Sequence, residues 1–281
     1  MTTPLEELLL RHIEAGTIPG AVALLASSGD VEMVAAGLAG VGGEPLRDDA
    51  IMRIQSMTKV ITSVAALRLV EAGRLGLDDS VAEWLPELAS RRVLRHPAAA
   101  LDDTVPARRP ITLRHLLTNT SGYGMATTDS PWQQAMVLNG TEAGPEPVSL
   151  GADEWLTRLA DLPLAFQPGE GWRYHHSFGI LGILLARLTG RPLGEHLAND
   201  LFDRLGMADT AYWCRSTSSI GCRRRTAMGR RGSSRPSPPA VASMPAHRPS
   251  TSATPNWSVR RATITASSGC SSTAVASTES R

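Results

Sequence analysis

Residues 54–60 read IQSMTKV and place a serine three positions before a lysine, at the start of a segment with helical apolar spacing. Residues three apart share one face of a helix, so the Lys59 amine can approach the Ser56 hydroxyl. A serine hydroxyl is a weak nucleophile until a neighbouring base takes its proton, and lysine can do so where its pKa is lowered. The helix N-terminus adds a field that favours negative charge. Apolar side chains are expected to bury this helix and hold the pair rigid: Met57, Val60, Ile61, Val64 and Leu67.

The same serine has a simpler interpretation. A serine at a helix start is usually a cap, and Ser-x-x-Lys occurs often by chance. The surrounding sequence must therefore decide between a helix cap and a nucleophile.

The segments around this motif predict strands first and a helical block afterwards. Apolar spacing predicts a helix over residues 4–14, and two apolar runs within 20–40 flank the turn at 28–30, as in a pair of strands. This order favours an α+β fold, or a sheet with a helical insert, over alternating βαβ units. Further helices are expected at 56–72, within 78–88, at 111–117, 153–160, 177–190 and 192–205, with loops at about 90–110 and 124–150.

Several stretches, in this order, resemble the serine β-lactamase, penicillin-binding-protein and related esterase family. They are ITSVAALRLVEAGRLGLDDSVAEWLPEL after the motif, PITLRHLLTNTSGYG at 110–124 and FQPGEGWRYHHSFGILGILLARLTG within 166–213. Ser-x-x-Lys is itself a motif of such enzymes. The resemblance covers about residues 18–213. It implies a β-lactamase/transpeptidase-like fold, with an antiparallel sheet flanked by helices and a separate helical region.

The resemblance also implies a third catalytic residue, Tyr174. Its phenol would accept the Ser56 proton and pass it to the leaving group. A phenol with a pKa near ~10 needs a nearby cation to ionise at neutral pH, and Lys59 could supply it. Where class C β-lactamases carry Tyr-Ser-Asn, this chain has Tyr174-His175-His176, which favours the esterase-like branch.

Three further residues are candidates for binding the substrate: Tyr123, His175 and His176. Structural roles are the alternative for the two histidines, which point opposite ways if their segment is extended, so a joint metal site is not expected. Gly124, Trp132 and Trp155 fit a pocket or the core equally well. The sequence contains no phosphate loop, dinucleotide fingerprint or zinc spacing, and no cofactor is expected. No Gly-x-Ser-x-Gly elbow surrounds Ser56, which disfavours an α/β-hydrolase.

The composition changes at residue 213. Residues 1–213 hold 17 Lys and Arg against 26 Asp and Glu, a net charge of −9, whereas residues 214–281 hold 11 Arg against one acid, a net charge of +10. The tail also lacks Leu, Phe, Tyr and Asp and contains all three cysteines, so a disulfide framework is excluded for the first 213 residues.

The tail has two interpretations. Read one base out of phase, the codons for Cys214-Arg215-Ser216-Thr217 can spell Val-Pro-Val-Asp, and those for 269–278 can spell Arg-Met-Leu-Leu-Asp-Gly-Gly-Arg-Leu-Asp. We infer a single-base frame change near residue 213, in the gene or its sequencing. The family-like domain would then be residues 1–213, and 214–281 a disordered Arg/Ser/Pro-rich tail. The alternative is a genuine basic tail that binds an acidic partner.

By the resemblance, the strand carrying the third motif and the second oxyanion-hole N–H would be missing, while the Ser56 N–H supplies the first. Losing one such donor costs ~10²–10³ in rate, so the chain is expected to be weakly active or inactive.

The sequence thus predicts a serine hydrolase that forms an acyl-enzyme on Ser56. Small esters are the first expected substrates, with β-lactams or D-peptide-like amides second, and a non-catalytic remnant of the fold is the rival interpretation. No apolar stretch reaches the ~18 residues of a membrane span, and the N-terminus does not resemble a signal peptide, which favours the cytoplasm. The acidic first 213 residues disfavour nucleic-acid binding. The oligomeric state stays open.

Overall fold

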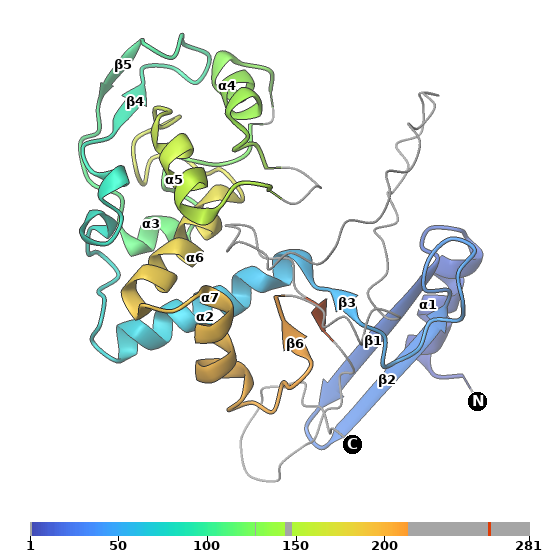
Figure 1. Ribbon diagram of the computed structural model, residues 1–281. Coiled ribbons are helices and arrows are strands. Elements are labelled where there is room, and N and C mark those ends of the chain that lie inside the picture. Colours follow the sequence, from blue (N-terminus) through green and yellow to red (C-terminus); the bar gives the residue numbers. More distant parts are fainter. Residues whose placement is uncertain (1, 127, 144–147, 213–257, 260–281) are drawn as a thin grey trace. The chain divides into compact units, whose positions relative to one another are not determined.

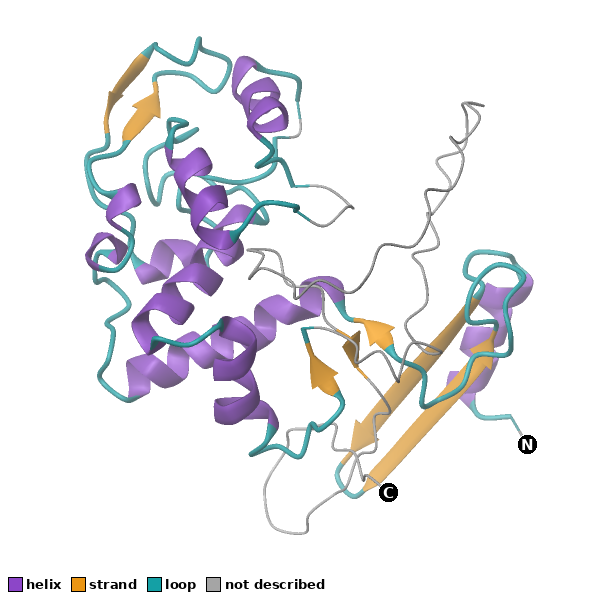
Figure 2. Cartoon of the chain, in the orientation of Figure 1, coloured by secondary structure: helices purple, strands orange, loops and turns teal. Residues whose placement is uncertain are grey.

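The computed structural model describes residues 2–126, 128–143, 148–212 and 258–259. These residues divide into two compact units. The strand unit comprises residues 2–53, 202–212 and 258–259, and the helical unit comprises the described residues within 54–201. Strands and helices are both present (Figure 2), as the α+β expectation requires.

The strand unit begins with a helix and a long hairpin, both confirmed as predicted. Helix α1 spans Pro4–Glu14, with Thr3 as its cap and Pro4 in its first turn. Strands β1 (Gly20–Ser27) and β2 (Asp30–Gly37) pair antiparallel from Gly20 opposite Gly37 to Ser27 opposite Asp30. The connecting turn contains Gly29 at φ 105°, a backbone conformation that glycine adopts without steric cost.

A second, small sheet of the strand unit joins distant parts of the sequence. Strands β3 (Met52–Arg53), β7 (Ser258–Val259) and β6 (Thr210–Ala211) lie in the order β3–β7–β6. The backbones of residues 258 and 259 pair with both neighbouring strands, and the disorder expected for the tail stays a prediction. The rest of the tail from 214 onward lies outside the described residues.

The helical unit is built around helix α6, which packs against α2, α3, α5 and α7 (Figure 1). Most of the predicted helices are present, but residues 78–88 hold only two short 3-10 turns, at 81–83 and 86–88, and the α-helices at 58–71 and 193–197 are shorter than expected. The elements are η1 (Gln55–Met57), α2 (Thr58–Glu71), η2 (Val81–Glu83), η3 (Pro86–Leu88), β4 (Arg92–Leu94), β5 (Thr104–Pro106), α3 (Leu113–Leu117), α4 (Pro131–Asn139), α5 (Ala152–Ala160), α6 (His176–Thr189), α7 (Leu193–Leu197) and η4 (Ala198–Phe202), whose last residue belongs to the strand unit.

Two segments expected to be loops contain regular structure. Helix α4 lies within 124–150, where Ser130 caps its start, Pro131 occupies its first turn and Gly140 ends it in the left-handed conformation. The short hairpin of β4 and β5 lies within 90–110. Only Trp132 and Met136 of α4 are buried, so the helix carries too short an apolar pattern to be recognised by periodicity, although its end signals are present.

The buried face of α2 differs from the expected one. Met57, Val60, Val64 and Leu67 were expected to bury the helix, but all four are exposed. Mostly smaller residues are buried instead, and α2 packs against α6, on which Gly179 and Gly182 are also buried. The buried residues of α2 are Thr58, Thr62, Ala65, Ala66 and Leu69.

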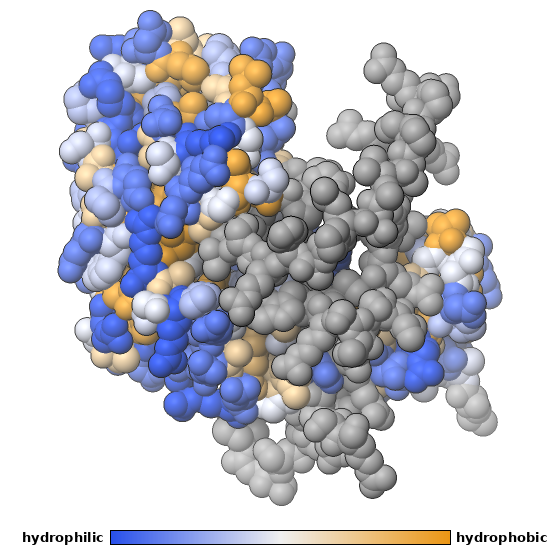
Figure 3. All heavy atoms as spheres, viewed as in Figure 1, coloured by the Kyte–Doolittle hydropathy of each residue, from blue (hydrophilic) through white to orange (hydrophobic). Residues whose placement is uncertain are grey.

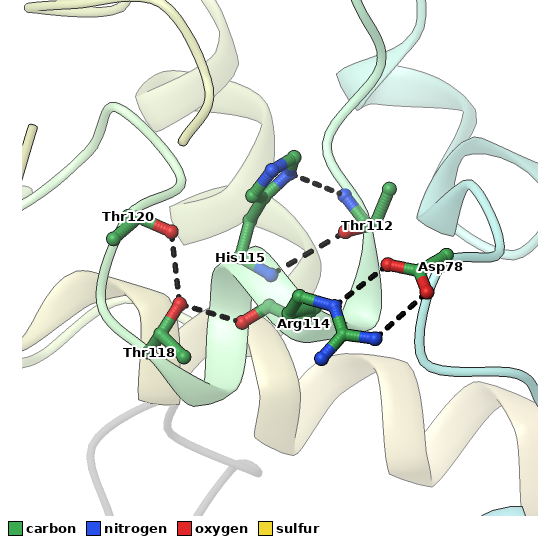
Figure 4. Close-up of polar contacts among 6 residues, drawn as sticks. All are labelled: Asp78, Thr112, Arg114, His115, Thr118 and Thr120. Atoms are coloured by element: carbon green, nitrogen blue, oxygen red, sulfur yellow. Dashed lines mark hydrogen bonds and ion pairs between the residues drawn. The ribbon is translucent and has the colours of Figure 1, made fainter. Parts of the chain in front are cut away.

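A polar network anchors α3, which precedes a loop important for the site (Figure 4). The Thr112 N–H donates to His115 Nδ1 (3.1 Å), and the His115 N–H donates to Thr112 Oγ1 (3.4 Å), which closes a reciprocal cap. Burial lowers the pKa of His115, so the ring stays neutral and can accept that bond. Arg114 makes two bonds of 2.7 Å to Asp78, which ties the cap to the preceding segment.

In the view of Figure 3, hydrophilic residues cover most of the visible described surface, and apolar residues form separate groups. Among the residues that the structure describes, no helix is long and apolar enough to cross a membrane.

Candidate active site

Ser56 lies in a strained turn at the start of α2. The turn η1 runs directly into α2, which places the exposed Ser56 at the positive end of the helix. The preceding residue, Gln55, adopts φ 47°, in the left-handed region that non-glycine residues seldom occupy. Backbone strain of this kind persists only where the surrounding structure enforces it, and it is concentrated at functional sites.

Three side chains from distant parts of the sequence meet at this turn. Lys59 Nζ lies 3.1 Å from Ser56 Oγ, and the Tyr174 hydroxyl lies 2.6 Å from the same oxygen. Lys59 Nζ also lies 4.6 Å from the centre of the Tyr174 ring. The expected meeting of Ser56, Lys59 and Tyr174 is therefore present in the structure.

The electrostatics of Tyr174 favour ionisation. Partial burial by itself would raise the pKa of this phenol, but hydrogen bonds with Ser56 and Lys59 and the Lys59 charge outweigh burial and lower the pKa below its usual value. Tyr174 donates to Ser56 in the neutral state, and once ionised it can accept a proton from the same oxygen. The arrangement can therefore move a proton from the serine to the phenol.

The loop after α3 holds the Tyr174 segment in place. The Arg173 N–H donates to the Asn119 carbonyl (3.0 Å), and the Met125 N–H donates to the Tyr174 carbonyl (2.8 Å). Gly124 is required here because a Cβ on it would lie 2.6 Å from the Arg173 carbonyl carbon. The motif Thr-Ser-Gly-Tyr-Gly thus contributes close backbone contact, which explains its glycine at 124.

His175 and His176, expected near the substrate, occupy different environments. His175 precedes α6 at φ 94° and meets the Tyr174 ring edge-on at 6.2 Å. His176 is fully buried, stacks on Trp155, and its Nε2 lies 2.8 Å from the Thr141 carbonyl. Desolvation lowers the pKa of each to about 4, so both rings are neutral at pH 7. Only His175 borders the site, and a substrate contact by His176 stays a prediction that its burial does not favour.

Tyr123 also lies in the core. It is fully buried, its hydroxyl donates to the Leu162 carbonyl (3.2 Å), and desolvation raises its pKa to about 12. These contacts account for Tyr123 as a structural residue, and its predicted role in substrate binding has no support from its position. Trp132 and Trp155 are buried as well, so of their two possible roles the structure favours the core.

Two aromatic residues beside the site were missed by the sequence analysis. Phe178 lies 5.8 Å from Lys59 Nζ, measured to its ring centre, and Trp172 stacks on Tyr174 with ring centres 6.1 Å apart. Phe178 is four residues from Tyr174 and Trp172 two residues before it, spacings that could have suggested both. Among the described residues, no group of three or more His, Cys, Asp or Glu is placed to hold a metal ion.

A family model described as Beta-lactamase matches residues 5–276. Esterase EstB of Burkholderia gladioli is 37% identical over 198 residues, which make up 69% of this chain and 47% of that protein. A lovastatin esterase of Penicillium rubens is 36% identical over 176 residues, 60% of this chain and 41% of that protein. The chain thus spans about half the length, or less, of these curated relatives.

This chain is also similar to a solved structure. EstCE1, described as a hydrolase with promiscuous acyltransferase activity, superposes with a TM-score of 0.62 at 29% identity. The superposition covers 76% of this chain and 53% of that one.

Proposed function

Because the chain belongs to the beta-lactamase family and has its β-lactamase/transpeptidase-like fold, we propose that it is a serine hydrolase that cleaves small carboxylic esters through an acyl-enzyme on Ser56. The observation that carries this proposal is the contact of one serine oxygen with both Lys59 and Tyr174. Relatives named as esterases support an ester over a β-lactam, as does His175-His176 in place of Ser-Asn after the tyrosine.

The mechanism follows from the geometry. Tyr174, ionised beside the Lys59 ammonium, takes the proton of Ser56 as the serine oxygen attacks the ester carbonyl. Collapse of the tetrahedral intermediate breaks the bond to the alcohol, and Tyr174 returns the proton to the departing oxygen. The same phenolate then takes a proton from water as that water attacks the acyl-enzyme, and it passes the proton to the Ser56 oxygen as the bond to the acyl group breaks and the acid is released.

Turnover by this chain is expected to be slow. By the resemblance, the second oxyanion-hole donor comes from a segment that is not recognisable in the sequence after residue 213, and one such donor contributes ~10²–10³ in rate. Acylation of Ser56 is therefore the step to measure, because a single acylation can be detected even where turnover is weak.

A labelling experiment tests this function. We expect a fluorophosphonate probe to label the protein, and p-nitrophenyl acetate to release a burst of nitrophenolate. Ser56→Ala removes the nucleophile and should abolish both signals, whereas Ser27→Ala, a change at an exposed serine of β1, should leave them unchanged. Tyr174→Phe should slow the burst by ~10²-fold or more, because it removes the proton carrier.

Two other outcomes would contradict the proposal. Absence of any label would favour a non-catalytic remnant of the fold. Salt-sensitive binding of polyanions without labelling would favour a tail that binds an acidic partner.

A further inference from the structure

Two large apolar side chains beside the Ser56–Lys59–Tyr174 group are exposed. Trp172 exposes 62% of its surface, and its ring stacks on Tyr174 at an interplanar angle of 25°. Met57, the neighbour of Ser56 in the chain, exposes 66%. Trp172 differs in this respect from Trp132 and Trp155, which the same unit buries.

An exposed tryptophan next to a reactive phenol has the properties of a ligand surface. Indole offers a large, rigid apolar face at a low cost in conformational entropy, and aromatic rings stack on it with specific geometry. Trp172 lies on the chain two residues before Tyr174, in a segment fixed by the backbone bonds of Arg173 and Tyr174 to the 119–125 loop. Its position relative to the phenol is therefore defined by the fold.

The proton path identifies which part of a substrate lies there. In the proposed function, on which this step rests, Tyr174 returns a proton to the departing alcohol oxygen. That oxygen must come within hydrogen-bond reach of the Tyr174 hydroxyl, so the alcohol lies on the tyrosine side of the reacting carbonyl. The Trp172 ring stacks on Tyr174, so it lies on the same side of the reacting carbonyl as the departing alcohol.

We infer that Trp172 binds the alcohol portion of the substrate, and that this portion is an apolar, ring-bearing group. Trp172 would then set specificity for the leaving group and leave the acyl group to other residues. The alternative is that Trp172 orients Tyr174 and does not bind the alcohol. In that case Trp172→Ala slows the acylation by all esters to the same degree.

Two acetate esters separate these roles, because they form the same acetyl-enzyme. The probes are 1-naphthyl acetate, with an aromatic alcohol, and 2,2,2-trifluoroethyl acetate, with a small activated one. Acylation is measured as the mass gain of one acetyl group under single-turnover conditions. Trp172→Ala should slow acylation by the naphthyl ester about tenfold and that by the trifluoroethyl ester less than about twofold. Hydrolysis of the acetyl-enzyme should not change, and Trp172→Phe should retain most of the preference.

A binding measurement makes the inference independent of chemistry. In Ser56→Ala protein, 1-naphthol should bind, and adding Trp172→Ala should weaken that binding about tenfold. Leu138→Ala serves as the matched control, because Leu138 is a more exposed apolar residue, at 87%, on helix α4 and should not matter.

The outcomes distinguish the inference from the proposed function. Equal slowing of acylation by both esters in Trp172→Ala would overturn the inference and show that Trp172 orients Tyr174. Unchanged acylation and naphthol binding in this variant would show that Trp172 does not contact the substrate. If neither ester acylates Ser56 while naphthol binding still depends on Trp172, the binding surface stands and the hydrolase proposal fails.

Discussion

The two units of this protein differ in how they are held together. In the helical unit, a continuous set of side chains on α2, α5 and α6 is buried, including Trp155, Leu156 and Leu181. Between residues 2 and 53 of the strand unit, no described residue is buried, and the β1–β2 hairpin depends on its backbone ladder. The helical unit can therefore fix the Ser56, Lys59 and Tyr174 geometry by its own packing.

The largest test of this contrast is a pair of truncations. Trp155→Ala removes a buried ring from the helical unit and should lower the free energy of unfolding by ~3–5 kcal/mol. Leu25→Ala on β1, where the side chain is 58% exposed, should change it by less than ~0.5 kcal/mol. Urea unfolding followed by far-ultraviolet circular dichroism measures both, and equal losses would break the distinction between the units.

Acid should destabilise the helical unit through His176. The folded state holds this ring neutral with a pKa of about 4, against an ordinary value of 6.5, so the unfolded chain binds more protons between these values. Above pH 6.5, the neutral His176 ring contributes up to ~3 kcal/mol to the free energy of unfolding. This contribution is lost as the pH falls to 4.

Urea midpoints at pH 7 and pH 5 measure this acid effect. His176→Gln, which can still donate to the Thr141 carbonyl, should reduce the dependence without removing it, because the pKa of His175 is also lowered to about 4. His96→Gln at an exposed position should leave the dependence unchanged. An unchanged slope in His176→Gln would show that other groups cause the acid sensitivity.

The smallest test compares two helix caps. Ser130 is 8% exposed and accepts from the Gln133 N–H at 3.2 Å, so Ser130→Ala should cost ~1 kcal/mol. Thr3 accepts from the Glu6 N–H at the same distance, but α1 has no buried residue, so Thr3→Ala should cost ~0.5 kcal/mol. Urea midpoints of the two variants compare them, and a larger loss from Thr3→Ala would reverse the expected ranking of the two units.

Local patterns predicted much of the fold. The hairpin was predictable because two apolar runs flank a glycine turn, and α1 because its apolar spacing and its cap agree. Helix α4 was not predictable from apolar spacing, because only two of its residues, Trp132 and Met136, are buried. The buried face of α2 was also mispredicted, because apolar residues lie on both sides of the helix and periodicity alone does not say which side is buried.

The meeting of Ser56 and Lys59 followed from their spacing, whereas that of Tyr174 with Ser56 depended on the resemblance to known motifs. Local spacing cannot place a residue 118 positions away. The burial of Tyr123 and His176 was not predictable for the same reason, since their neighbours Leu162, Thr141 and Trp155 are distant in sequence or reached only through the tertiary fold.

The backbone at Gln55 has a consequence for engineering. Glycine adopts its φ of 47° without the penalty of about 1 kcal/mol that a side chain incurs, so Gln55→Gly would relieve that penalty in the resting protein. The same change would loosen the turn that aims the Ser56 oxygen. Glycine also gives the unfolded chain more freedom, which offsets much of that gain, so variants at this position need screening for both stability and reactivity.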